Sequence, residues 1–495
     1  DYDVDVLVVG AGNGGLTAFL AAADGKAKTL LIEVSGATGG STLTAGGILH
    51  TSGLRTWADY NKQTLGLHDQ VLGKVFVETF WDELIPWLQS KGAYMSRPTP
   101  TATGSSGDWV FGKGENLATS VPHRLYFDSL SKAAQALGGT MLLKTRAVKL
   151  YADDQRRVVG LQAMTWSGSP LEPNQKLINI KAKKVILATG NFYANKEMLC
   201  RYIGHDADTA RNYGMSPYQT GEGIAMAQAV GAMMSGSLST FSGSTVALFP
   251  AQLIRDDPVA YEKWLTEKTP ETYKVTKDAE KPAGPFTQSG ANANAILVNL
   301  DGKRFWDESN TVISGSRRMI FDVVQQRRGR AWVIADQNTF DADTTSAAKV
   351  KAITDLGGKV FTANTLEEFA TLLQAEQGMY KPGLLKTIAE YNAAIDNGTT
   401  EQLDPPRTKQ TKFTKISKGP FYAFAITSNI YYNAGGLAMN ADGQTLDYLG
   451  RPIPNLYAIP PCGGGIMTAV YTGGIAAAGT FGYRAGKHAA ANLNN

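Results

Sequence analysis

Three glycines near the start of the chain are spaced so that their backbone could hold a phosphate. Gly10, Gly12 and Gly15 follow a strand-like apolar run and precede a helix-like stretch. A second apolar run then ends at Glu33. Gly10 would permit the tight turn, Gly12 would let a pyrophosphate approach the backbone, and Gly15 would let the helix pack close to the sheet. The helix N-terminus would attract the phosphates and Glu33 would bind a ribose hydroxyl, so the pattern predicts a dinucleotide-binding βαβ unit.

Composition argues against several other kinds of site. The chain has 495 residues, a net charge of +4 and 43% hydrophobic residues, which suits an enzyme of two or more domains and is too weakly basic to indicate nucleic-acid binding. Its two cysteines, Cys200 and Cys462, cannot build a disulfide framework, and they and the five histidines lack metal-binding or haem-binding spacing. No apolar run reaches membrane-spanning length. We therefore expect no metal site, no nucleic-acid partner and no membrane span.

The first residue bears on localisation. The sequence begins at Asp1 rather than at a methionine, which fits either a trimmed chain or a removed export signal. We expect a cytoplasmic protein, and an exported, periplasmic one if Asp1 marks a cleaved signal peptide.

The elements that follow the βαβ unit are expected to extend its sheet. Strand-like runs at 146–151 and 157–161 predict a hairpin. The apolar run 184–187 ends in a small-residue turn and predicts an inner strand of the same sheet. The expected fold class is therefore α/β.

A change in amino-acid composition along the chain indicates a second domain. Between about 240 and 415, charged helical stretches mix with loops rich in proline and lysine, and glycine-rich strand and turn patterns return afterwards. We predict a discontinuous Rossmann-like domain over 1–240 and 416–495, with an α+β capping domain inserted over 241–415.

Five segments carry motifs that are specific when they are taken together, at 10–47, 185–195, 220–223, 299–308 and 433–436. They resemble the FAD-pyrophosphate block and the "ATGGF-AN", "TGDG", "N-x-x-G-x-R-F-x-x-E" and "x-GG" motifs of one FAD-dependent superfamily. This superfamily contains soluble fumarate reductases, urocanate-type reductases and 3-ketosteroid dehydrogenases. The resemblance covers nearly the whole chain.

The resemblance implies FAD, a capping domain and hydride transfer at flavin N5 across a C–C bond next to a carbonyl or carboxylate. It also implies which residues contact FAD: Gly10, Gly12, Asn13, Gly14, Gly15, Glu33, Val34, Ser35, Gly39, Gly40, Ser41, Thr42, Ala45, Gly46, Gly47, Ala147, Val148, Ala188, Thr189, Gly190, Asn195, Gly221, Gly435, Gly464 and Gly465. One acid is missing from this pattern, because the family's "Y-A-A-G-E" is replaced by residues 457–462, which include two prolines. Flavin binding is expected to be rearranged there.

Three departures from the family concern the substrate. Fumarate-type reductases carry a catalytic arginine at a position that falls on or near Val312 here. Their histidine before the glycine pair is replaced by Tyr431 and Tyr432. Their second arginine is replaced by Tyr471. A dicarboxylate needs cationic, often bidentate partners. These departures disfavour a dianionic substrate.

Tyrosine at the last of these positions resembles the 3-ketosteroid dehydrogenases. By that resemblance, Tyr471 and the backbone N–H of Gly474 would polarise a ketone oxygen, since a phenol donates a hydrogen bond without requiring a counter-charge. The family's tyrosine base has no match here, so Tyr431, Tyr432 or Tyr193 would have to handle the proton. The predicted reaction adds or removes hydrogen across a C=C bond conjugated to a carbonyl, on an apolar cyclic ketone.

Other functions remain open on the sequence. Arg317 or Arg318 could clamp a carboxylate, which would make the protein a reductase of an unsaturated acid such as fumarate, acrylate or urocanate. A flavin oxidase of an alcohol or amine, or a non-catalytic flavin subunit of an electron-transfer complex, would use the same scaffold. Because the chain has no haem motif, electrons would pass to or from a separate carrier, a quinone or O₂. The sequence leaves the oligomeric state open.

Overall fold

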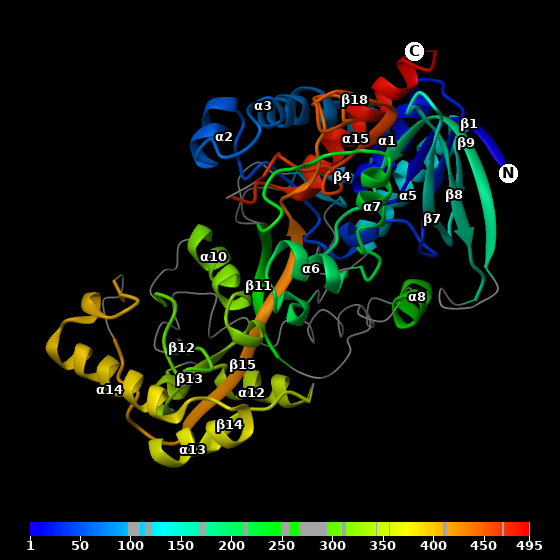
Figure 1. Ribbon diagram of the computed structural model, residues 1–495. Coiled ribbons are helices and arrows are strands. Elements are labelled where there is room, and N and C mark those ends of the chain that lie inside the picture. Colours follow the sequence, from blue (N-terminus) through cyan, green and yellow to red (C-terminus); the bar gives the residue numbers. More distant parts are fainter. Residues whose placement is uncertain are drawn as a thin grey trace.

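Two sheets of different construction organise the chain (Figure 1). The computed structural model describes residues 1–97, 109–113, 121–168, 175–211, 216–248, 258–267, 295–308, 313–342, 344–355, 357–408, 413–467 and 470–494. The larger sheet has eight strands, in the order β17-β18-β9-β1-β2-β6 with β7 and β8 extending from β9. The second sheet has five strands, in the order β11-β15-β13-β12 with β14 on β15.

Strand β1 (Tyr2–Val9) is the centre of the larger sheet. It pairs in parallel with β2 (Thr29–Ile32) and β9 (Lys176–Leu187), and Val9 aligns with the last residue of each. From Val6 to Val9 its side chains alternate between two apolar cores, which explains the continuous apolar run at the end of the strand. Because the three strands end at one edge, the loops that follow them meet there.

The predicted hairpin is confirmed. Strands β7 (Thr145–Ala152) and β8 (Val158–Thr165) pair antiparallel, and β8 pairs with β9. Asp153 holds the turn, because its Oδ1 accepts from the backbone N–H groups of Gln155 and Arg157, at 2.9 Å each.

Helices α1 (Asn13–Asp24) and α15 (Gly474–Ala491) pack closely along one face of the larger sheet (Figure 1). Small residues make this possible. A Cβ on Gly482 would collide with the backbone of Gly14, and one on Gly486 would lie 2.5 Å from the carbonyl oxygen of Ala18. The first helix of the nucleotide-binding unit is therefore held by a helix that is far away in the sequence.

The second sheet is antiparallel and is joined to the first by its longest strand. Strand β15 (Phe421–Asn433) pairs with β11 (Phe241–Ala247), β13 (Arg330–Ala335) and β14 (Phe361–Ala363). In Figure 1 β15 runs from the second sheet toward the region of α15. Its last residues therefore lie where the two parts of the fold meet.

The other helices and strands are α2 (Trp57–Gln63), α3 (Gln70–Thr79), α4 (Ile85–Ser90), α5 (Val121–Ala136), α6 (Lys196–Tyr202), α7 (Glu222–Ala229), α8 (Pro258–Glu267), α10 (Ile313–Val324), α11 (Gln337–Asp341), α12 (Ser346–Asp355), α13 (Leu366–Gln377), α14 (Lys381–Asn397), β3 (Ile48–Leu49), β4 (Met95–Ser96), β5 (Trp109–Phe111), β6 (Thr140–Leu142), β10 (Met234–Ser235), β12 (Ile296–Val298), β16 (Gly436–Leu437), β17 (Gln444–Leu446) and β18 (Pro452–Ala458). Among the described helices, none is both long and apolar enough to cross a membrane. The described residues also gather no cluster of His, Cys, Asp or Glu that could hold a metal ion.

Helix α8 departs from the sequence-based division into domains. It falls within 241–415, yet its Tyr261 and Leu265 belong to the same apolar core as α1 and α15. The domain ranges themselves stay a prediction.

Candidate cofactor and active site

The glycine turn after β1 has the three properties that its spacing predicts. Gly10 has φ +105°, and a Cβ there would collide with the carbonyl oxygen of Ala188. A Cβ on Gly15 would collide with the carbonyl oxygen of Gly10, so the helix can lie against the turn only because residue 15 is glycine. Gly12 is different, because the nearest atom to a Cβ there would be the carbonyl oxygen of Gly39 at 3.9 Å. The backbone of Gly12 is therefore left open to a ligand.

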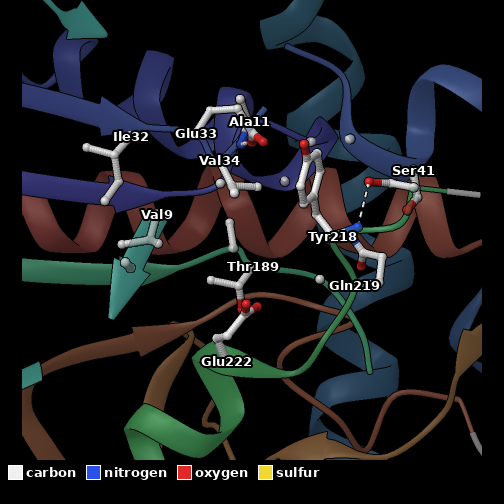
Figure 2. A pocket seen from close by; sticks show the side chains of 18 of the residues that line it. Val9, Ala11, Ile32, Glu33, Val34, Ser41, Thr189, Tyr218, Gln219 and Glu222 are labelled. Atoms are coloured by element: carbon white, nitrogen blue, oxygen red, sulfur yellow. Dashed lines mark hydrogen bonds between the residues drawn. The ribbon is translucent and has the colours of Figure 1, made fainter. Parts of the chain in front are cut away.

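A cavity lies over this turn, between the edge of the larger sheet and the segment before α7 (Figure 2). It encloses about 890 Å³ of space, including solvent at its mouth. Among the described residues no side chain caps α1, so the N–H groups at its start face this space without a side-chain partner. The lining residues are Val9, Gly10, Ala11, Gly12, Asn13, Gly14, Ile32, Glu33, Val34, Gly40, Ser41, Thr42, Thr145, Arg146, Ala147, Ala188, Thr189, Gly190, Ser216, Tyr218, Gln219, Glu222, Met226, Pro460, Pro461 and Ala478.

Glu33 closes one end of the cavity and is buried. One carboxylate oxygen accepts the backbone N–H of Ala11 at 2.6 Å, and the other accepts that of Ser35 at 2.9 Å. Burial raises the pKa of Glu33 to about 7, against the two N–H groups that favour the charged form. Each oxygen keeps a lone pair for a ribose hydroxyl, so Glu33 lies where the predicted ribose-binding acid belongs.

The raised pKa of Glu33 predicts how the cofactor-free protein responds to pH. The folded protein holds this proton more tightly than the unfolded chain, in which the pKa is near 4.5. The stabilisation is therefore complete below about pH 4.5 and falls by up to about 3 kcal/mol as the pH rises to about 7. Urea unfolding of the wild type and of Glu33→Gln at pH 5 and pH 7 measures this. The wild type should lose more stability than the variant, and equal losses would contradict the prediction.

These features fit the adenosine and pyrophosphate part of FAD. The uncapped helix start suits a pyrophosphate, the open backbone of Gly12 admits it, and Glu33 suits a ribose. When bound, FAD would supply a hydride-transferring ring. The residues of this cavity would hold it.

About half of the predicted cofactor residues line the cavity. They are Gly10, Gly12, Asn13, Gly14, Glu33, Val34, Gly40, Ser41, Thr42, Ala147, Ala188, Thr189 and Gly190. Those that do not line it are Gly15, Ser35, Gly39, Ala45, Gly46, Gly47, Val148, Asn195, Gly221, Gly435, Gly464 and Gly465. Asn195 has a local role, because its Oδ1 accepts from the backbone N–H of Met198 at 3.1 Å and caps α6.

Several residues that line the cavity are absent from the predicted set of FAD-binding residues. Arg146 and Glu222 form an ion pair at 2.6 Å across the cavity wall, and the ring of Tyr218 projects into the space. Pro460 and Pro461 line the cavity where the family carries its acid. The sequence pointed to this wall through Ala147, the glycine motif at 220–223 and the departure at 457–462, but it did not indicate Tyr218.

Tyr471, predicted to hold the ketone oxygen, and Tyr432, a candidate for handling the proton, meet at the start of α15. The rings of Tyr432 and Tyr471 make an edge contact, with centroids 5.6 Å apart. A Cβ on Gly474 would lie 2.9 Å from the ring of Tyr432 and 3.1 Å from the hydroxyl of Tyr471. The glycine at the first position of α15 therefore leaves room for both phenols beside a helix N-terminus.

Burial settles the protonation state of the phenols in this region. It raises the pKa of Tyr432 above its ordinary value, and it raises the pKa of Tyr60 to about 12. The Tyr60 hydroxyl lies 3.1 Å from the hydroxyl of Thr472, next to Tyr471 in the sequence. Near neutral pH these phenols are hydrogen-bond donors rather than bases.

The other candidates lie apart from this pair. Tyr431 is 37% exposed and its hydroxyl bonds that of Ser244 at 2.5 Å. The hydroxyl of Tyr193 bonds that of Ser41, and burial raises the pKa of Tyr193. Arg317 falls within α10, and its side chain, like Val312, lies outside the described residues.

His50 is a residue that the predicted site lacks. Its ring faces that of Tyr471 edge-on with centroids 6.4 Å apart, and its carbonyl abuts Gly473 at the start of α15. Nδ1 of His50 accepts the backbone N–H of Ser52 at 3.0 Å. In the neutral ring the proton therefore sits on Nε2.

The "N-x-x-G-x-R-F-x-x-E" motif has a structural explanation. Arg304 and Glu308 form an ion pair whose side chains are 3% and 6% exposed. Arg304 also donates to the carbonyl oxygens of Pro405 at 2.8 Å and Trp306 at 3.2 Å, and Glu308 accepts the N–H of Leu297 at 2.9 Å. The pair ties the segment after β12 to a distant loop.

Comparison with known proteins agrees with this geometry. The family model described as "FAD binding domain" matches residues 5–476. The chain is 27% identical over 98% of its length to a probable fumarate reductase, Ifc3, of Shewanella frigidimarina, and covers 74% of that protein. It is 27% identical over 97% of its length to an NADH:acrylate oxidoreductase of Vibrio harveyi, of which it spans about half, 49%. The structure of a 3-ketosteroid Δ1-dehydrogenase from Sterolibacterium denitrificans superposes with a TM-score of 0.68 over 99% of this chain and 100% of that one, at 18% identity.

The fold and the cavity thus define a flavoprotein oxidoreductase that uses FAD. More particularly, the chain belongs to the FAD binding domain family whose model spans residues 5–476. The predicted α/β fold, the FAD cofactor and the resemblance to fumarate reductases and ketosteroid dehydrogenases are confirmed.

Proposed function

We propose that the protein exchanges hydrogen across a C=C bond conjugated to a carbonyl group, and that its substrate is a neutral, apolar cyclic ketone of the ketosteroid kind. The observation that carries this proposal is the pair Tyr471 and Tyr432 beside Gly474 at the start of α15. Protonated phenols and helix N–H groups stabilise negative charge that develops on a ketone oxygen. They offer a carboxylate less than a guanidinium would.

Each residue then has a defined task. Tyr471 and the N–H of Gly474 hold the ketone oxygen, and Tyr432 packs against Tyr471 and orients its ring. Bound FAD supplies hydride transfer at one carbon. We assign the proton at the neighbouring carbon to His50, because its ring lies edge-on to that of Tyr471 and its Nε2 carries a proton in the neutral ring.

The proposed role of His50 predicts a change in the pH profile. His50→Gln should change the pH dependence of kcat/KM with an enone, because the proton at the neighbouring carbon would then have to pass through another group. His205→Gln serves as the matched control, because the side chain of His205 is 79% exposed and pairs with Asp206 at the surface. If His50→Gln retains the wild-type profile, another group handles the proton.

The main alternative is a reductase of an unsaturated carboxylic acid. It is favoured by the names of the two relatives reported above, which act on fumarate and acrylate. It would require a cation near Tyr471, and the arginines of α10 are the candidates for it.

One experiment separates the two. The purified FAD protein is titrated anaerobically with cyclic enones and saturated ketones and, after chemical reduction, with enones, fumarate, acrylate and urocanate, while the flavin spectrum is followed. Oxidation by enones, or reduction by saturated ketones, supports the proposal and gives the direction. Oxidation by the acids alone would overturn it.

Electron partners and location follow as further proposals. A separate carrier, a quinone or O₂ would accept or supply the electrons, and we keep the cytoplasm as the proposed location. Stopped-flow reoxidation of the reduced protein by O₂ and by a quinone tests the first point.

A further inference from the structure

One wall of the FAD cavity is hydrogen-bonded to helix α8, which has no part in the proposed reaction. The ring of Tyr218 stands among the cavity residues near Val34 and Ser41 (Figure 2). Its hydroxyl donates to Oε1 of Glu262 at 2.8 Å, and Glu262 lies on α8. The other carboxylate oxygen accepts the backbone N–H of Gly36 at 2.9 Å. A single buried carboxylate therefore joins the loop after β2 to the segment before α7.

Apolar packing holds α8 in this position. Tyr261 is 1% exposed, and its ring meets that of Tyr218 edge-on with centroids 5.9 Å apart. Leu265 is buried in the same core, and its carbonyl oxygen accepts from Arg124 at 3.2 Å. The helix is thus anchored on both sides of Glu262.

A side chain at residue 36 would have no room beside Glu262 in its present position. A Cβ on Gly36 would lie 2.8 Å from Oε2 of Glu262 and 3.3 Å from the side chain of Lys144. The guanidinium of Arg146 lies 5.9 Å from the centre of the Tyr218 ring. Burial raises the pKa of both Glu262 and Glu33, and the charge of Glu262 adds to the rise at Glu33.

Gly12, Glu33 and Tyr218 line the same cavity, so the ring of Tyr218 is part of the wall around a dinucleotide that uses Gly12 and Glu33. We propose that Tyr218 and Glu262 form a clasp, which we call the α8 clasp, and that opening it sets the rate at which FAD enters and leaves. The clasp does not depend on the identity of the substrate.

Release of FAD from the holoprotein tests this directly. Flavin fluorescence is followed after dilution into an excess of an apoprotein that binds FAD tightly, which makes release irreversible. Glu262→Ala removes both hydrogen bonds and should release FAD about tenfold faster or more, the factor expected when a hydrogen bond to a charged group is lost. Tyr218→Phe keeps the ring and should accelerate release to a smaller extent. Lys263→Ala changes the exposed side of the same helix and should leave the rate unchanged.

Hydrogen exchange provides a second readout that needs no turnover. Amides of α8 should be better protected in the FAD-bound wild type than in the apoprotein, and Glu262→Ala should lose that difference. Release at the wild-type rate from both Glu262→Ala and Tyr218→Phe would overturn the α8 clasp. So would equal exchange of α8 with and without FAD. If Glu262→Ala does not fold, the Tyr218→Phe rate and the wild-type exchange decide.

Discussion

Replacing Tyr471 by phenylalanine should lower kcat/KM for a cyclic enone by about 10²–10³, which is the usual cost of removing one donor from an oxyanion site. The ring would remain in contact with Tyr432 and the backbone of Gly474 would be unchanged, so the loss would report the hydroxyl alone. Because the hydrogen bond strengthens as charge develops on the ketone oxygen, kcat should fall more than KM rises. Steady-state kinetics with the best enone from the titration measures this effect.

Two control variants make the Tyr471 result interpretable. Tyr448→Phe removes an exposed hydroxyl and should leave the kinetics unchanged, since Tyr448 is 70% exposed. Tyr431→Phe should have a small effect, because that hydroxyl bonds Ser244 instead of facing Tyr471. A Tyr471→Phe enzyme with wild-type kcat/KM would remove the basis for choosing a neutral ketone.

Breaking the buried ion pair between Arg304 and Glu308 should cost about 3–5 kcal/mol of stability. Among the described residues, Arg304→Met would leave the buried carboxylate of Glu308 with the N–H of Leu297 as its one hydrogen-bond partner, and it would also release the carbonyl oxygens of Pro405 and Trp306. Denaturant unfolding followed by tryptophan fluorescence measures the loss, since Trp306 and Trp332 lie in this part of the fold.

The double variant Arg304→Met/Glu308→Leu should recover part of the loss, because it removes the uncompensated charge as well. The exposed pair Lys351 and Asp355, with side chains 73% and 58% exposed, is the matched control. Lys351→Met should change stability by no more than about 1 kcal/mol. Similar losses in the buried and exposed variants would mean that burial does not decide the strength of the pair.

The nucleotide-binding unit could be predicted because its chemistry is local. The turn at Gly10, the close packing at Gly15 and the open backbone at Gly12 each follow from residues a few positions apart, and Glu33 follows the next strand. The hairpin of β7 and β8 could be predicted for the same reason, because its two strands follow each other in the sequence.

The "R-F-x-x-E" segment shows where a motif gives a position without giving a role. The sequence identifies this segment only as one of the five family motifs. The structure shows that Arg304 and Glu308 are bonded to each other and to neighbouring backbone, so they stabilise the fold around β12. A motif match carries no information about which of its side chains are buried.

The remaining site residues could not be predicted, because the contacts are made by segments that lie far apart in the chain. His50 meets Tyr471 only after α15 packs against the N-terminal segments. Glu262 reaches Gly36 from a helix that composition assigned to another domain. The position of His50 after the glycine pair at 46–47 does not show which side chain it meets, and Glu262 belongs to no spacing pattern, so only the folded chain shows their neighbours.

The seam between α1 and α15 has a consequence for biosynthesis. A ribosome makes α1, which ends at Asp24, long before it makes α15, which begins at Gly474. Until then the apolar face of the nascent α1 is not covered by α15, and we expect chaperones to bind it. Polypeptides that are released early should be degraded as colourless fragments, because the yellow cofactor would find a finished pocket only after the late helix arrives.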